Sequence, residues 1–156
     1  MTPAVAFLKS RDISFELLEY QLDTAHNIGV AAAQTMGLDA NRVFKTLIAS
    51  IDDGQLVCAI IPVAAQLHLK RLGKASGSKS AAMADTKTAE KATGYVTGGI
   101  SPFGQKKTLP TFLAEQSLDH ERIYVSGGKR GLEIAVATED LIRSCHAEVC
   151  KLTREA

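Results

Sequence analysis

The sequence predicts an α/β (α+β) domain built on a curved, mixed β-sheet that is barrel-like and surrounded by short helices. Short runs of alternating and β-branched residues, bounded by glycine and aspartate turns, indicate several short strands. The helical segments are also short and do not alternate regularly with the strands, which argues against a doubly wound parallel sheet. Since no repeat or linker-like segment divides the chain, we expect residues 1–156 to form a single domain.

The first forty residues contain two helical segments around one strand. Thr2 is the expected N-cap of the first helix, with Pro3 at its first helical position. A strand over 13–20 and an alanine-rich helix over 28–38 follow. Asp39 is placed to cap a turn that leads into the next strand.

The middle of the chain begins with a predicted hairpin. An apolar run from Val43 to Ile51 meets the turn Asp52-Asp53-Gly54, and a second apolar run follows over 55–63. Residues 65–72 have a helical pattern, and residues 73–83 are predicted to form a basic loop.

The second half of the chain contains five predicted segments. They are a helix capped by Asp85 and ended by Gly94, a glycine-rich loop at 95–104, an edge or bulged strand broken at Pro110, two strands around a glycine turn within 121–137, and a helix over 138–145 with Thr138 as its N-cap.

Lys45 is the residue of the first hairpin strand that needs an explanation. It is the only charge in the strand, and the residues that share its face by alternation, Val43, Leu47, Ala49 and Ile51, are apolar. An ammonium group there must reach water, find a partner or take part in chemistry. The alternative is a structural lysine whose stem lies on apolar side chains while its head reaches the surface.

Two glycine-rich bends are the other candidates for a site. They are TGGISPFG at 97–104 and SGGKRG at 126–131. Paired glycines allow the backbone to approach a ligand closely and to present N–H groups, which can stabilise the oxyanion of an acyl transfer. The alternative is that both pairs are simply turns.

Composition restricts the class of protein. Formal net charge is +1, with 46% apolar and 22% charged residues, so nucleic-acid binding would have to come from local basic clusters such as those at 70–79, 106–107 and 129–130. No signal peptide or membrane-spanning run is visible, and the odd count of three cysteines fits a reduced, cytoplasmic setting.

Metal and cofactor chemistry have little support in the sequence. Cys145, His146 and Cys150 lack a fourth ligand at the usual spacing for zinc, and neither a Walker A motif nor G-x-G-x-x-G is present. No convincing Ser-His or Cys-His pair stands out as a nucleophile and base. We therefore expect no metal and no cofactor.

The ordered set VFKTLIA, GGISPFGQKK and YVSGGKRGLEI resembles the YbaK/EbsC family over nearly the whole chain. That family is related to the editing domain inserted in many bacterial prolyl-tRNA synthetases. The resemblance implies a YbaK-like fold and an aminoacyl-tRNA deacylase that removes cysteine mistakenly attached to tRNA(Pro). It also implies prolyl-tRNA synthetase as a partner.

The resemblance assigns roles to particular positions. Lys45 matches the essential lysine of the family, and it would position the 3′ end of the tRNA. The remaining positions are expected to bind substrate: Tyr20, Thr46, Gly98, Gly99, Ile100, Ser101, Pro102, Ser126 and Gly127. Glu133 stands where relatives often carry an acidic residue, without an assigned role.

The resemblance also implies a mechanism. The substrate's own cysteine thiol would attack its ester carbonyl and release a cyclic thioester, so the protein supplies no nucleophile. Two alternatives stay open. One is editing of another small residue such as alanine on tRNA(Pro) by water, and the other is a non-catalytic module that binds tRNA or the synthetase.

Overall fold

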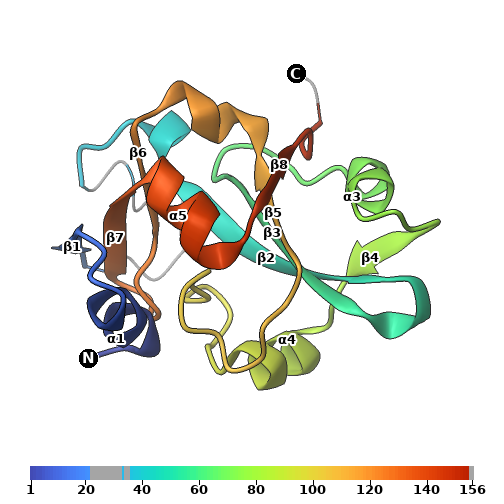
Figure 1. Cartoon of the computed structure of the whole chain (residues 1–156), viewed down its shortest axis with the longest axis horizontal. Coiled ribbons are helices and arrows are strands. Elements are labelled where there is room, and N and C mark those ends of the chain that lie inside the picture. The colour runs from blue at the N-terminus through green and yellow to red at the C-terminus, as the bar shows by residue number, and fades with distance from the viewer. Residues whose placement is uncertain (22–32, 34–35, 155–156) are drawn as a thin grey trace.

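The computed structural model describes residues 1–21, 33 and 36–154 as two β-sheets with helices packed around them (Figure 1). The alanine-rich helix predicted over 28–38 lies mostly outside these residues. Just after it, Asp39 accepts a hydrogen bond of 2.9 Å from the Asn41 N–H and caps the 3₁₀ turn η1 (Ala40–Arg42), as predicted.

The larger sheet has five strands in the order β4-β2-β3-β5-β8. β2 (Phe44–Ile51) pairs antiparallel with both β3 (Leu56–Pro62) and β4 (Ala81–Met83). β5 (Thr111–Ala114) pairs in parallel with β3 and with β8 (Glu148–Cys150). The predicted hairpin and the mixed sheet are therefore confirmed, although Ala81–Met83 is a strand where we predicted a loop.

The smaller sheet is antiparallel, with β7 (Leu132–Ala137) between β1 (Phe15–Glu19) and β6 (Arg122–Ser126). A parallel bridge between Val43 and Tyr124 connects it to the start of β2. The α/β class is confirmed, but among the described residues the strands do not close into the barrel-like sheet that we predicted. A barrel needs strand pairing that continues around the whole sheet, and within the described ranges this bridge is the only pairing between the two sheets.

Local capping chemistry correctly predicts two of the helices. The Thr2 hydroxyl accepts from the Val5 N–H at the start of α1 (Pro3–Ser10). Asp85 accepts from the Thr88 N–H at 2.8 Å at the start of α4 (Thr86–Thr93), and Gly94 ends that helix at φ 82°.

The helix predicted over 65–72 is shifted in the structure. α3 runs over Leu69–Ala75, and the His68 side chain accepts from the Arg71 N–H as its N-cap. The residues before it are held by the C-terminal segment instead, through a bridge between Leu67 and Thr153. Tertiary pairing therefore overrides local helical pattern there.

The C-terminal part differs from the prediction at two positions. Thr138 is the first residue of α5 (Thr138–Cys145) rather than its N-cap, because its hydroxyl donates to the His120 carbonyl at 2.7 Å. Pro110 precedes β5, which is an interior strand between β3 and β8 and not an edge. The Pro110 carbonyl accepts from the Cys58 N–H, so the proline still contributes to the pairing.

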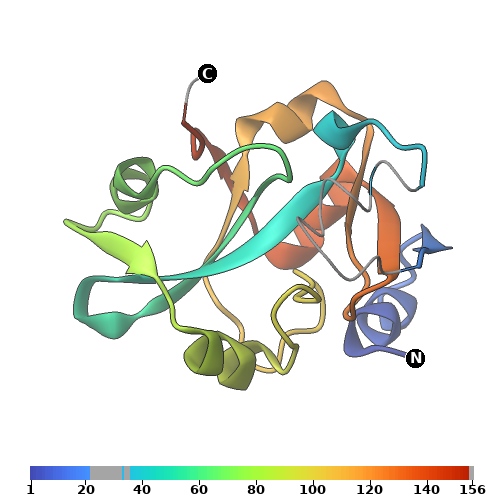
Figure 2. The ribbon, with the colours of Figure 1, turned by 180° about the vertical axis from the view of Figure 1, so that it is seen from behind.

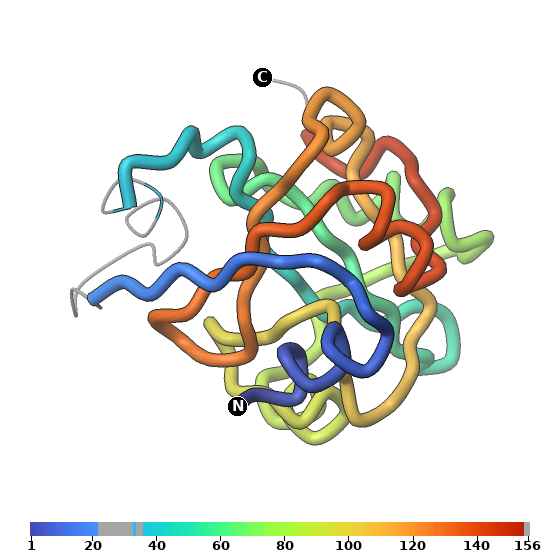
Figure 3. Tube along the Cα trace, turned by 60° about the vertical axis from the view of Figure 1, so that its left-hand side comes forward, coloured from blue at the N-terminus to red at the C-terminus, as the bar shows by residue number. Residues whose placement is uncertain are grey.

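The core brings the N-terminal helix against the glycine-rich loop at 95–104. The Phe7 and Phe103 rings stack with their centroids 5.8 Å apart. Figures 1 and 2 show α1 and α4 at the same end of the molecule as this loop, and Figure 3 shows α1 beside it. The backbone of Pro3 lies so close to Gly104 that a side chain at Gly104 would clash with it. The end of the loop is therefore packed closely against α1.

Candidate active site

One edge of β2 is only partly covered. β2 pairs with β3 along most of its length, but with β4 only from Ala49 to Ile51. The Ile48 carbonyl accepts from the Ala84 N–H at 3.1 Å, which shows that the backbone groups of Ile48 point toward the β4 side. Since backbone direction alternates along a strand, those of Thr46 point the same way, to an edge that β4 does not reach.

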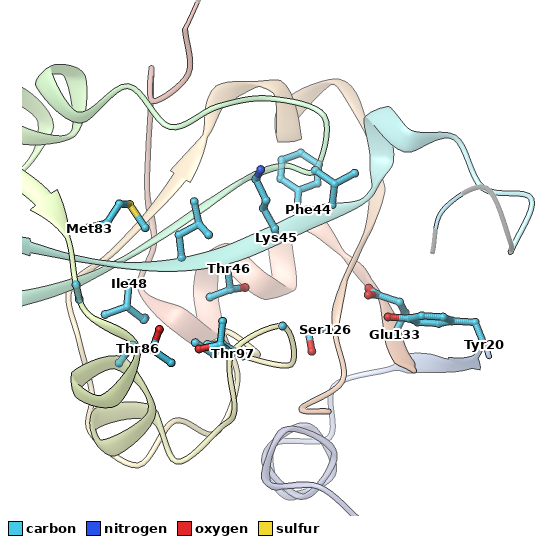
Figure 4. Close-up of a pocket in the computed structure, with 16 residues that line it drawn as sticks. Tyr20, Phe44, Lys45, Thr46, Ile48, Met83, Thr86, Thr97, Ser126 and Glu133 are labelled. Atoms are coloured by element: carbon cyan, nitrogen blue, oxygen red, sulfur yellow. The ribbon is translucent and has the colours of Figure 1, made fainter. Parts of the chain in front are cut away.

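A cavity of about 400 Å³ lies at this edge (Figure 4). It brings together side chains from β2, β4, α4, the glycine-rich loop and the smaller sheet. The described residues that line it are Tyr20, Phe44, Lys45, Thr46, Leu47, Ile48, Val63, Met83, Ala84, Thr86, Ala89, Thr97, Gly98, Ile100, Ser126 and Glu133. Six of the predicted site residues are among them: Tyr20, Lys45, Thr46, Gly98, Ile100 and Ser126.

Lys45 lies at the rim of the cavity. Figure 4 shows its side chain leaving β2 on the side opposite to Thr46 and Ile48, as alternation requires. The lysine is half-buried, and partial burial lowers the pKa of its ammonium group. In the part of the chain that the structure describes, no carboxylate pairs with it. A cation held in this way is available to an anionic ligand.

Thr46 points to the interior of the cavity. Its side chain is buried, and its hydroxyl has no hydrogen-bond partner among the described groups. A buried hydroxyl without a partner costs free energy, so its retention favours a role toward a bound molecule.

The loop at 97–102 is fixed by contacts on both sides of Thr97. The Thr97 N–H donates to Glu90 at 2.7 Å, and the Thr97 carbonyl accepts from Arg130 at 3.0 and 3.2 Å. The Gly99 N–H donates to the Val96 carbonyl at 2.9 Å, so this amide is occupied within the loop. Of the predicted oxyanion donors, the amides of Gly98 and Ile100 belong to residues that line the cavity.

The two glycine-rich bends pack directly on each other. A Cβ at Gly99 would lie 2.8 Å from the Lys129 Cα and 2.9 Å from the Arg130 nitrogen. Backbone cannot approach so closely past any larger residue, which explains glycine at this position. The bends therefore form one continuous wall.

Four predicted site residues, Gly99, Ser101, Pro102 and Gly127, belong to the two bends but are not among the lining residues. Ser101 is fully buried, and its hydroxyl accepts from the Phe103 N–H. The Pro102 carbonyl accepts from the Cys145 thiol, and the Gly127 carbonyl accepts from the Thr2 hydroxyl. These residues shape the site through the backbone and do not face its interior.

The smaller sheet supplies the opposite end of the cavity. Ser126 in β6 pairs directly with Glu133 in β7, so both side chains project from the same face. Glu133 is 7% exposed, and burial raises the pKa of its carboxyl to about 8. Burial also raises the pKa of the Tyr20 hydroxyl, whose side chain points toward Glu133 in Figure 4.

Sequence reasoning missed most of the apolar lining. Phe44 and Ile48 could have been found, because each is two residues from Thr46 on β2 and so shares its face. The residues from β4 and α4, including Met83, Ala84 and Ala89, are brought to the cavity only by the tertiary fold. They carry no local signal.

The cysteines do not contribute to the described lining. All three thiols are free, and burial raises the pKa of Cys58 to about 12 and those of Cys145 and Cys150 to about 11. Histidine is also absent from the described lining. The described residues contain no group of three or more metal-ligating side chains and no helix long and apolar enough to cross a membrane.

A family model described as an aminoacyl-tRNA editing domain matches residues 23–144. The chain belongs to this family. This description agrees with the resemblance seen in the three motifs and, together with the name of the relative below, supports an aminoacyl-tRNA deacylase. The candidate active site falls largely inside the matched region, with Tyr20 just before it.

A curated relative of the chain is a protein of Enterococcus faecalis named "Putative Cys-tRNA(Pro)/Cys-tRNA(Cys) deacylase EbsC". It is 35% identical over 152 residues, which cover 97% of this chain and 93% of the relative.

Two solved structures share the fold at 21% identity. One is described as a "putative trans-editing enzyme for prolyl tRNA synthetase", with a TM-score of 0.86 over 98% of this chain and 96% of that chain. The other comes from work on epitope grafting onto scaffold proteins, with a TM-score of 0.88 over 99% and 96%. The YbaK-like fold that we predicted is confirmed.

Proposed function

We propose that this protein deacylates cysteinyl-tRNA, with Cys-tRNA(Pro) as the main substrate and Cys-tRNA(Cys) as a second one. The observation that carries the proposal is a single cavity shared by Lys45, Thr46, the Gly98 loop and Ser126. The name of the Enterococcus relative supports the substrate class.

The substrate's thiol is the proposed nucleophile. The described lining contains no cysteine or histidine, so no thiol or imidazole of this wall is available to attack the ester. The cysteine sulfur forms a bond to the ester carbonyl carbon, and the bond from that carbon to the ribose oxygen breaks. The thiol proton passes through solvent to the ribose oxygen, and a cyclic thioester leaves. A tethered thiol has a high effective concentration, which favours this route.

Backbone and hydroxyl groups stabilise the oxyanion in this proposal. Because the Gly99 N–H is occupied by Val96, we assign the donors to Gly98 and Ile100, with the partnerless Thr46 hydroxyl beside them. Such fixed donors lower the barrier without reorganising.

Lys45 positions the tRNA end. Its place at the rim, away from the buried donors, fits contact with the terminal phosphate or ribose better than contact with the reacting carbonyl. Burial disfavours its charge, and an incoming phosphate favours it.

Prolyl-tRNA synthetase is the proposed partner, and the chain 1–156 is the proposed editing domain acting in the cytoplasm, where tRNA is charged. A net charge of +1 gives little attraction for the tRNA body, so the synthetase would supply selectivity among cysteinyl-tRNAs. Adding the synthetase to a deacylation assay should raise the preference for Cys-tRNA(Pro) over Cys-tRNA(Cys). If the isolated protein preferred Cys-tRNA(Pro) as strongly as the protein with added synthetase, this assignment would be contradicted.

Deacylation of purified Cys-tRNA(Pro) tests the proposal. The wild type should free the tRNA from its cysteinyl group rapidly, and Lys45→Ala should lower kcat/KM by roughly 100-fold, as expected for a lost charge-assisted contact. Lys9→Ala, an exposed lysine of α1 outside the cavity, is the matched control. Equal rates for Lys45→Ala and the wild type would defeat the role of Lys45, and a wild type that binds without turnover would indicate a non-catalytic module.

A further inference from the structure

Glu133 is the acidic group of the cavity that the proposed reaction does not use. It lies in the central strand β7 of the smaller sheet, opposite Ser126 on one side and Leu18 on the other. Cross-strand partners project from the same face, so these side chains share the face that meets the cavity. Tyr20 follows two residues after Leu18 and joins the same group.

The Glu133 carboxyl is buried without a full set of partners. It is 7% exposed, and its Oε2 atom has no hydrogen-bond partner among the described groups. Desolvation raises its pKa to about 8. A buried acceptor with no donor is costly, and a ligand that brings donors and positive charge removes that cost.

A basic and an acidic side chain stand at two ends of the cavity. Among the described lining residues, Lys45 is the one basic side chain and Glu133 the one carboxylic acid. In Figure 4, Lys45 projects from β2, while Glu133 lies with Tyr20 at the smaller sheet. An aminoacyl-tRNA end has the complementary pattern, since it carries phosphate at one end and an α-ammonium group next to the ester.

We propose that Glu133, with the Tyr20 hydroxyl beside it, binds the α-ammonium group of the aminoacyl ester. The inference rests on the proposed function, because it takes the cavity to hold such an ester. An ammonium group offers three donors and one positive charge, which match the free carboxyl oxygen and the neighbouring hydroxyl. Glu133 is then a specificity-determining residue that touches substrate.

A consequence follows for substrate choice. Esters whose α-amino group is acylated, such as those of peptidyl-tRNA, lose both the charge and two donors. With such an ester bound, Glu133 would stay buried beside a neutral amide that cannot replace the ammonium group. The cavity would therefore accept free aminoacyl esters and reject N-blocked ones, which protects growing chains from cleavage.

Equilibrium binding separates this inference from the catalytic proposal. The probes are the stable amide 3′-cysteinylamino-3′-deoxyadenosine and its Nα-acetyl derivative, measured by calorimetry. The wild type should bind the free amine about 10- to 100-fold more tightly than the acetylated form. Glu133→Gln, which keeps the shape but not the charge, should remove this preference and leave the affinity for the acetylated form within about 2-fold. Glu121→Gln, an exposed carboxylate outside the cavity, is the control and should keep the preference.

Three results would overturn the inference: equal binding of the two probes by the wild type, an unchanged preference in Glu133→Gln, or an equal loss for both probes in a folded Glu133→Gln. If Glu133→Gln does not fold, Glu133→Asp gives the same comparison, since shortening the side chain should weaken the preference. Loss of the amine preference in Glu133→Gln, together with a wild type that fails to deacylate Cys-tRNA(Pro), would refute the proposed function and leave the amine site standing.

Discussion

The two ends of the cavity hold their charged groups differently. Lys45 is half-buried at the rim on the edge of β2, whereas Glu133 is almost fully buried in the centre of the smaller sheet. Desolvation acts on both, lowering the pKa of the lysine and raising that of the glutamate to about 8. Desolvation thus disfavours the charged form of each group, and an oppositely charged ligand favours it.

The difference in burial also separates the two ends energetically. A rim cation can be solvated when the site is empty, so it costs little stability. A buried carboxyl cannot be solvated in this way, so burying it lowers the stability of the folded protein when it ionises. The Glu133 end is therefore where binding and stability should be most strongly coupled.

The largest expected effect is on the pH dependence of stability. The folded protein holds Glu133 neutral up to a pKa of about 8, while the unfolded chain ionises it near 4.5. Its contribution to folding is therefore fully present below pH 4.5 and is lost as pH rises toward 8. Glu133→Gln should be more stable than the wild type at pH 8.5, by up to about 5 kcal/mol, and the gain should shrink at pH 5.

Urea unfolding at the two pH values measures this effect, with Glu121→Gln as the exposed control. A difference between Glu133→Gln and the wild type that does not change with pH would show that Glu133 is already ionised in the folded protein.

An intermediate effect is expected where the two bends meet. Gly99→Ala places a Cβ within 2.9 Å of the backbone of Lys129 and Arg130, so it should separate the bends. We expect a loss of about 1–3 kcal/mol in the free energy of unfolding. The deacylation rate should fall by more than it does when a single contact at the rim is removed. Thermal unfolding and single-turnover deacylation give the two readouts.

Gly73→Ala in α3 is the matched control for that change, because its Cβ would meet only ordinary van der Waals contacts, with the backbone of Ser78 and Ser80. It should keep activity. Full activity in Gly99→Ala would mean that the site tolerates separation of the bends. The amides of Gly98 and Ile100 would then not need to be held rigidly.

The smallest expected effect concerns Thr46, which lies between the two ends. Thr46→Val removes a buried hydroxyl that has no partner, so the free energy of unfolding should rise by about 1 kcal/mol. Deacylation should fall about 10-fold if the hydroxyl donates to the oxyanion. A variant that is both more stable and equally active would remove Thr46 from the mechanism.

The parts of the fold that depend on local chemistry were predictable from sequence. The caps at Thr2 and Asp85 and the hairpin turn at Asp53-Gly54 each carry their own signal. The start of α3 and the strand β8 were not, because each is decided by pairing with a distant segment. The same reason explains why two sheets replace the predicted barrel-like one.

The site shows the same division. Lys45 could be noticed as a charge in an apolar strand, and the bends at Gly98 and Gly127 as glycine pairs, while their roles came from the family resemblance. Their meeting at one cavity required the fold, as did the apolar wall around Met83. The role of Glu133 could not be read from sequence, because nothing local reveals that its carboxyl is buried with a free oxygen.

The central claim is that the substrate's thiol performs the cleavage inside this cavity. Single-turnover deacylation of Cys-tRNA(Pro) and of 2-aminobutyryl-tRNA(Pro), which has a methyl group in place of the thiol, tests it most directly. Since the isostere has no nucleophile, we predict cleavage at least about 100-fold slower than that of the cysteinyl ester. Cleavage of both esters at the same rate would contradict the account and would indicate attack by water.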